Sequence, residues 1–254
     1  MKRPDFLNFK VDHMTLLVSP SLYNVSYLIF RTIFGCEPIH MIYEKRKKWS
    51  RDTEEKSLTF AMQVGNHPEA ASELDAVNIA VVQPSEPGDQ SSHVRTILSQ
   101  RGSEAHWQHI ALRTPDLIAF HKHASDRGVN FITPILRDDS DDVIQVFTGE
   151  WFSPSGRPSG MFFEFLQRSP SPELLSKIAD KNRESWFNDK TFLGLYGEKE
   201  REYLEDRVVP FIDPELYHQI HPLVARSNLW EISESTVNTA EEIMLRYALK
   251  KQKN

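Results

Sequence analysis

The alternation of apolar and polar positions predicts strands at the start of the chain. Residues 9–18 have the pattern of a strand, and Ser19-Pro20-Ser21 is typical of a helix start. Apolar residues then recur at helical spacing from Leu22 to Ile33, and Gly35 ends the predicted helix. Strand-like runs follow at residues 38–43, 57–64 and 77–83, with a polar loop over residues 45–56. The predicted order is β-α-β-β-β.

The same order returns after a polar linker and a predicted helix over residues 90–101. A strand over residues 108–113 leads into a helix that Thr114-Pro115-Asp116 opens and Gly128 ends, and strands fit residues 130–136, 143–148 and 160–167. Both halves share His-x-x-Leu, a helix and a glycine, and such repetition decides architecture. We therefore expect an α+β fold of two side-by-side βαβββ modules that form a curved sheet around a cleft.

The predicted divisions are a first module over residues 8–89, a linker helix with the second module over residues 90–169, and a C-terminal helical segment over residues 170–254. Charged helical patterns dominate that last segment, and prolines at 210, 214 and 222 interrupt them. Residues 186–192 form an aromatic patch unlike its surroundings, and residues 239–250 have the pattern of an amphipathic helix.

Composition restricts the classes of function. The chain has 254 residues, a net charge of −6 and one cysteine, Cys36. The acidic balance argues against nucleic acid as the main partner, and one cysteine allows neither an intrachain disulfide nor a cysteine-based zinc site. No stretch is long and apolar enough to span a membrane, and no signal-type apolar core follows the N-terminus, so we expect a cytoplasmic protein without a membrane partner.

Three metal-competent side chains are set into apolar strands. His13 and His109 occupy equivalent positions of the repeat, and Glu164 shares a strand face with Phe162 and Leu166. An unpaired carboxylate in such a setting would suffer heavy desolvation, so a cation is expected nearby. Two histidines and one carboxylate match the ligand set of non-haem Fe(II) oxygenases, which leaves open positions for substrate and dioxygen.

These segments resemble the catalytic half of 4-hydroxyphenylpyruvate dioxygenase, a family of the vicinal oxygen chelate superfamily. The match is carried by the first strand with His13, by residues 108–112, and by residues 144–148 and 162–168, within a resemblance that covers roughly residues 8–196. It implies Fe(II) as cofactor, with His13, His109 and Glu164 as its ligands, and it is compatible with a homodimer.

The resemblance also implies a substrate pocket and a C-terminal lid. Phe147 and Phe192 would sandwich a substrate ring, and Phe187 and Phe192 correspond to two phenylalanines of the family's gating helix. The pocket would be lined by Gln108, Gln145, Phe147, Phe162, Phe187 and Phe192, together with Val82 and His93, which replace polar pocket residues of the family. Ala80 replaces another pocket residue, so we expect a substrate other than 4-hydroxyphenylpyruvate.

The implied reaction is oxidative decarboxylation and hydroxylation of an aryl or apolar 2-oxo acid by dioxygen at Fe(II). Two alternatives stay open. One is an extradiol ring-cleaving dioxygenase acting on a catechol, because Ser153-Pro154-Ser155-Gly156 is faintly similar to that family's loop before its glutamate. The other is a protein of the same fold that binds an apolar ligand without turnover.

Overall fold

The computed structural model describes residues 3–38, 41–48, 56–65, 77–84, 92–137, 142–184 and 191–253. Two compact units make up the chain. The N-terminal unit consists of residues 10–112 and 199–204, and the C-terminal unit consists of residues 1–9, 113–198 and 205–254.

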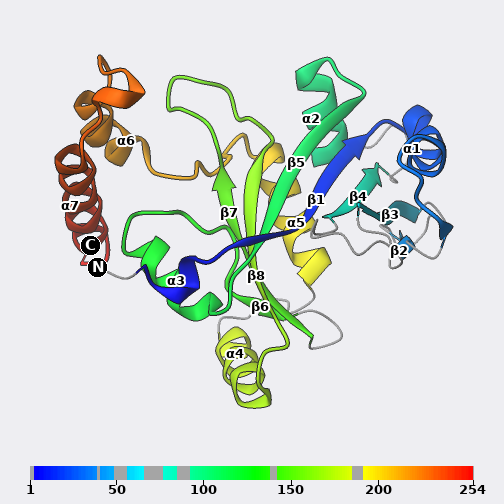
Figure 1. Ribbon diagram of the computed structural model, residues 1–254, viewed down its shortest axis with the longest axis horizontal. Coiled ribbons are helices and arrows are strands. Elements are labelled where there is room, and N and C mark those ends of the chain that lie inside the picture. The colour runs from blue at the N-terminus through cyan, green and yellow to red at the C-terminus, as the bar shows by residue number, and fades with distance from the viewer. Residues whose placement is uncertain are drawn as a thin grey trace. The chain divides into compact units, whose positions relative to one another are not determined.

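The N-terminal unit is built on a sheet of five strands in the order β2-β3-β4-β1-β5 (Figure 1). Strand β1 pairs with β4 in parallel, whereas β3 pairs with both β2 and β4 in antiparallel fashion. The strands are β1 (Lys10–Val18), β2 (Met41–Lys48), β3 (Lys56–Val64), β4 (Val77–Gln83) and β5 (Ala105–Arg113). Strands β1 and β5 carry His13 and His109, so the sheet order brings the two repeat-related histidines onto neighbouring strands.

Helix α1 (Pro20–Thr32) closes the core of this unit. Its first residue is a proline, whose fixed backbone dihedral suits a helix start, and Gly35 follows the helix with a positive φ of 67°. Tyr23 and Phe30 on its inner face pack against Val18, Cys36, Phe60, Met62 and Val81. Full burial of one such large apolar side chain is worth about 1.5–3 kcal/mol. Helix α2 (His93–Arg101) begins where the Ser92 hydroxyl accepts from the Arg95 N–H.

The C-terminal unit contains three strands in the order β8-β7-β6. They are β6 (Leu136–Arg137), β7 (Val143–Glu150) and β8 (Phe162–Arg168), and each neighbouring pair is antiparallel. Helix α3 (Leu117–Ser125) is capped by the Asp116 carboxylate, which accepts from Ala119 N–H. Phe120 of α3 packs against Phe165 of β8 and against Phe9, with ring centroids 4.3 and 5.0 Å away.

Helices dominate the remainder of the chain. These are α4 (Pro172–Glu184), α5 (Thr191–Leu204), α6 (Pro214–Ile220) and α7 (Glu234–Lys251), with short 3-10 turns at Asp5–Leu7, His221–Leu223 and Leu229–Glu231. Helix α7 is fastened to the start of α6, because Tyr247 and Lys251 both donate to the Asp213 carboxylate. Among the residues that the structure describes, no helix combines the length and hydropathy needed to cross a membrane.

The predicted α+β fold with its two βαβββ modules and a C-terminal helical segment is confirmed. Two local predictions were wrong. Residues 45–48, expected in a polar loop, lie in β2, whose place at one end of the strand order suits a charged edge strand. The strand expected over residues 130–136 is reduced to β6 and isolated bridges, because Pro134 has no N–H to donate to a ladder.

Candidate metal centre

His13 lies on β1 with a carboxylate beside its ring. Asp12 Oδ1 lies 3.1 Å from His13 Nδ1, and Asp12 is buried. An ionised carboxylate can only accept, so Nδ1 carries the proton and donates it. The other ring nitrogen, Nε2, is then the metal-competent atom, and a carboxylate behind a histidine makes it a stronger ligand.

His109 lies on β5 and shows the same arrangement with an amide in place of the carboxylate. Gln108 Oε1 lies 3.2 Å from His109 Nδ1, and the amide nitrogen of Gln108 lies 3.1 Å from His93 Nε2. The carbonyl oxygen of an amide can only accept, so His109 Nδ1 donates to it. Each histidine is thus oriented by the side chain that precedes it in the sequence, and its Nε2 is left for another partner.

The two Nε2 atoms face each other at 3.4 Å, and the rings are nearly perpendicular. The Thr15 hydroxyl also approaches His109 Nε2, at 3.0 Å, and it can donate to that lone pair. With both Nδ1 atoms protonated, neither Nε2 has a proton for the other. A metal–nitrogen distance near 2.1 Å puts two ligand nitrogens at a right angle about 3 Å apart, so this spacing suits a shared cation.

Glu164 is on β8 and is almost fully buried, with 3% of its surface exposed. Its neighbour across the antiparallel pair is Phe147 on β7. Taking a carboxylate out of water is costly unless a cation or hydrogen-bond donors compensate.

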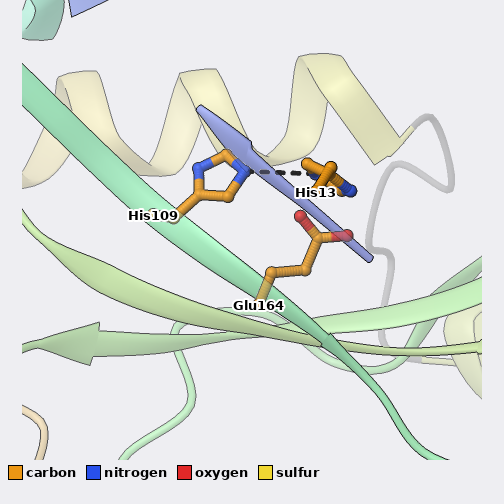
Figure 2. A group of neighbouring side chains, drawn as sticks. All are labelled: His13, His109 and Glu164. Carbon is orange, nitrogen blue, oxygen red and sulfur yellow. Dashed lines mark hydrogen bonds between the residues drawn. The ribbon is translucent and has the colours of Figure 1, made fainter. Parts of the chain in front are cut away.

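His13, His109 and Glu164 form a group in which one ligand-type atom from each residue lies within 4.8 Å of the others (Figure 2). The donor set is two imidazole nitrogens and one carboxylate oxygen. Divalent iron, cobalt and zinc all accept such donors, and three protein ligands leave coordination positions for other molecules. The residues therefore fit a divalent metal.

Other predicted site residues come together on one face of the C-terminal unit. Gln145 and Phe147 are two residues apart on β7, so their side chains share one face of the strand. The antiparallel register sets them opposite Leu166 and Glu164. Phe147 and Phe162 are buried with Leu136 and with Leu195 of α5. Gln145 is half-buried. This face thus combines Glu164, two aromatic rings and one amide under a cover that α5 contributes.

The remaining predicted pocket residues have different surroundings. Val82 and Ala80 are buried on β4, where they pair with Leu17 and Thr15 of β1. His93 and Gln108 are buried and hydrogen-bonded to each other. Phe187 lies outside the described residues. Phe192 lies in α5, but its side chain is not among those described, so the lid stays a prediction.

Sequence reasoning missed four polar residues near the histidines. Asp12 and Thr15 flank His13 in a segment whose pattern predicts a strand. Lys199 and Glu202, one turn apart on α5, form a buried ion pair with Nζ 2.8 Å from Oε2. Their spacing of three along a charged helix looks like a solvated surface pair, and no local signal marks them as buried. The acceptor residue directly before each repeated histidine was a signal that the sequence did contain.

No family model and no curated protein matches the chain by sequence. Among solved structures, a variant of 4-hydroxymandelate synthase from Streptomyces coelicolor matches with a TM-score of 0.50 and 18% identity. That match covers 77% of this chain and 55% of the synthase, so the chain spans about half of that protein. Methylmalonyl-CoA epimerase from Mycobacterium tuberculosis matches at 19% identity and a TM-score of 0.41, over 69% of this chain and 97% of the epimerase. The chain has the same fold as the synthase, the vicinal oxygen chelate fold.

Proposed function

We propose that the protein is a non-haem Fe(II) dioxygenase that converts an aryl or apolar 2-oxo acid by oxidative decarboxylation. The observation that carries the proposal is the group of His13, His109 and Glu164, in which both histidines have Nδ1 engaged and Nε2 directed at the other ring. The similarity in fold to 4-hydroxymandelate synthase supports a reaction of this class.

His13 Nε2, His109 Nε2 and a Glu164 oxygen would hold the metal. Asp12 and Gln108 keep the proton on the Nδ1 atoms, so that no proton has to leave the ligand nitrogens when the metal enters. When bound, Fe(II) supplies electrons for the reduction of ground-state dioxygen and a Lewis-acidic centre that a 2-oxo acid can chelate.

The face around Glu164 accounts for an apolar substrate. Phe147 and Phe162 offer ring surfaces beside the carboxylate, and α5 covers them through Leu195. Such a cover excludes water from a reactive site. Gln145 adds an amide to this face, and that amide can orient the substrate by a hydrogen bond.

The overall reaction balances with dioxygen as the oxidant. The bond between the 2-oxo carbon and the carboxylate breaks and releases carbon dioxide. One oxygen atom of dioxygen enters the new carboxylate of the shortened acid, and the other enters a hydroxyl group on the same molecule. Over a full turnover the net electrons come from the 2-oxo acid, so no separate reductant is consumed.

Oxygen uptake tests this proposal. The chain is loaded anaerobically with Fe(II), mixed with aryl and aliphatic 2-oxo acids or with catechols, and followed with an oxygen electrode and a carbon dioxide assay. We expect one carbon dioxide per dioxygen with at least one 2-oxo acid, and loss of both signals in Glu164→Ala. Uptake with catechols only would assign an extradiol dioxygenase, and binding of these compounds without uptake would assign a ligand-binding protein.

A further inference from the structure

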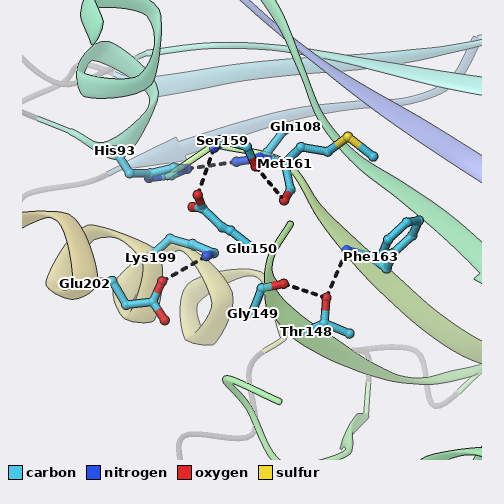
Figure 3. Close-up of polar contacts among 11 residues, drawn as sticks. His93, Gln108, Thr148, Gly149, Glu150, Ser159, Met161, Phe163, Lys199 and Glu202 are labelled. Atoms are coloured by element: carbon cyan, nitrogen blue, oxygen red, sulfur yellow. Dashed lines mark hydrogen bonds and ion pairs between the residues drawn. The ribbon is translucent and has the colours of Figure 1, made fainter. Parts of the chain in front are cut away.

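His93, Gln108 and His109 form a chain of side-chain hydrogen bonds in the N-terminal unit. His93 on α2 contacts Gln108 on β5, and Gln108 contacts the neighbouring His109 (Figure 3 shows the first of these contacts). His93 and Gln108 are 2% and 1% exposed, so water does not compete for these hydrogen bonds.

An amide between two imidazoles links their tautomers. In the observed orientation the Gln108 N–H donates to His93 Nε2, and Gln108 Oε1 accepts from His109 Nδ1. If the amide were reversed, its NH2 group would face His109 Nδ1, and that nitrogen would have to be an acceptor. The proton of neutral His109 would then sit on Nε2, the atom that a metal needs. His109 Nε2 can therefore bind a metal only when Gln108 Oε1 faces His109 Nδ1.

His93 selects that orientation if it presents a lone pair at Nε2. Burial first, and then the Lys199 ammonium group, lower the pKa of His93 to about 3. The His93 ring is therefore neutral at neutral pH. Lys199 is itself fully buried and paired with Glu202, so its charge is fixed in place (Figure 3). A neutral ring with its proton on Nδ1 accepts at Nε2.

We propose that His93 is a positioning residue for the metal ligand His109: by accepting the Gln108 amide N–H it holds the orientation of Gln108 that keeps the His109 proton on Nδ1. The inference rests on the metal site of the proposed function and assigns His93 a role other than contact with substrate. The Asp12 carboxylate has no orientation of this kind to select, so His13 needs no third residue.

The tautomers test the inference in the metal-free full-length protein. Two-bond 1H–15N correlation spectra distinguish the ring nitrogens of a histidine and show which one carries the proton. We expect the proton on Nδ1 in both His93 and His109. In His93→Gln, whose amide oxygen can accept from Gln108, His109 should keep it there. A proton on Nε2 of His109 in the wild-type protein would overturn the proposal.

Metal affinity gives a second readout that does not depend on turnover. Co(II) serves as the probe, because its ligand-field spectrum reports the nitrogen ligands. Loss of a residue that orients a metal-ligating histidine typically costs 10–100-fold in affinity, so we expect a loss of about that size in His93→Leu and recovery of most of it in His93→Gln. Wild-type affinity and spectrum in a folded His93→Leu, or equal losses in both variants, would contradict the role.

These results separate the inference from the proposed function. If the Co(II) and tautomer results hold but no 2-oxo acid supports oxygen uptake, the positioning role stands and the proposed reaction fails. If oxygen uptake is coupled as expected but His93→Leu binds Co(II) like wild type, the reaction stands and the positioning role fails.

Discussion

His13 Nε2 and His109 Nε2 lie 3.4 Å apart, and each ring has an oxygen of the preceding residue against its Nδ1. The repeat therefore carries more than a candidate ligand in each module: it carries that histidine together with an acceptor against its Nδ1 atom. In the first module the acceptor is the carboxylate of Asp12, and in the second it is the amide oxygen of Gln108. Two lone pairs directed at one another favour a cation between them.

Replacing Asp12 should weaken metal binding without removing a ligand. Asp12→Leu takes the acceptor from His13 Nδ1, and we expect the affinity for Fe(II) to fall about 10–100-fold. Asp12→Asn keeps an acceptor oxygen but loses the charge, so its affinity should lie between those of Asp12→Leu and wild type. Asp126→Asn, at the end of α3, is the matched control. Anaerobic titration gives the dissociation constants, and equal affinities across the series would rule out an orienting role for Asp12.

Replacing Thr15 should strengthen metal binding. The Thr15 hydroxyl competes with a metal for the lone pair of His109 Nε2, which lies 3.0 Å away. Thr15→Val conserves shape and removes this hydrogen bond, whose net worth of about 0.5–1.5 kcal/mol corresponds to a gain in metal affinity of about 2–10-fold. Calorimetric titration with Zn(II) measures the change. A marked loss of affinity would show that the hydroxyl supports the bound metal instead.

4-Hydroxyphenylpyruvate should be a poor substrate. Ala80 and Val82 are buried on β4, and Ala80 pairs with Thr15, so these two positions offer no side-chain hydrogen-bond partner to a phenol. An apolar pocket rejects an added hydroxyl only weakly, so we expect kcat/KM for phenylpyruvate to exceed that for 4-hydroxyphenylpyruvate by up to about 100-fold. Parallel assays of carbon dioxide release give the ratio. Efficient formation of homogentisate would contradict this account of β4.

Asp213 should stabilise the attachment of α7 in a pH-dependent way. Partial burial alone would raise the pKa of Asp213, but hydrogen bonds from Lys251, Tyr247 and Asn130 outweigh it and leave the pKa below its usual value. Stability from this group is therefore complete above the pKa of an unfolded carboxyl, about 3.9, and is lost as the pH falls through the lower folded value.

Asp213→Ala tests this attachment. Losing charge-assisted hydrogen bonds costs about 1.5–3 kcal/mol each in favourable cases, and each kcal/mol lowers Tm by about 2–4 °C in a chain of this size. At neutral pH, the Tm of Asp213→Ala should lie below that of wild type by the full amount. Near pH 3 the difference in Tm should be smaller. If the difference in Tm grew as the pH fell, the predicted pH dependence of the Asp213 contribution to stability would be wrong. Asp126→Ala, on the exposed side of α3, serves as the control.

The sequence predicted the fold well because its signals are local. Pro20 and Gly35 bracket α1, and Asp116 and Gly128 bracket α3, so both modules could be placed before any tertiary contact was known. The strand over residues 130–136 failed because Pro134 breaks the ladder, which local apolar pattern does not reveal. The prediction of a loop over residues 45–48 was wrong because these residues lie in β2, at the edge of the sheet. An edge strand does not need the apolar alternation by which strands are recognised.

For the candidate site, the sequence supplied His13, His109 and Glu164, because the repeat and the apolar setting are both visible in one dimension. Lys199 could not have been predicted. Its burial beside His93 depends on where α5 lies, and helical spacing alone cannot distinguish a buried Lys199–Glu202 pair from a solvated one. His93 was predicted as a pocket residue, whereas its hydrogen bond to Gln108 points to an orienting role.

Metal stoichiometry measures whether His13, His109 and Glu164 hold one metal ion. The full-length chain is stripped with chelator, loaded anaerobically with Fe(II), freed of excess metal and analysed for iron, alongside His13→Ala, His109→Ala, Glu164→Ala and the control His121→Ala, whose ring packs on Phe131. We expect one iron per chain in wild type and in His121→Ala, and loss of tight binding in the other three variants. Undiminished iron in the triple variant of His13, His109 and Glu164 would contradict this expectation.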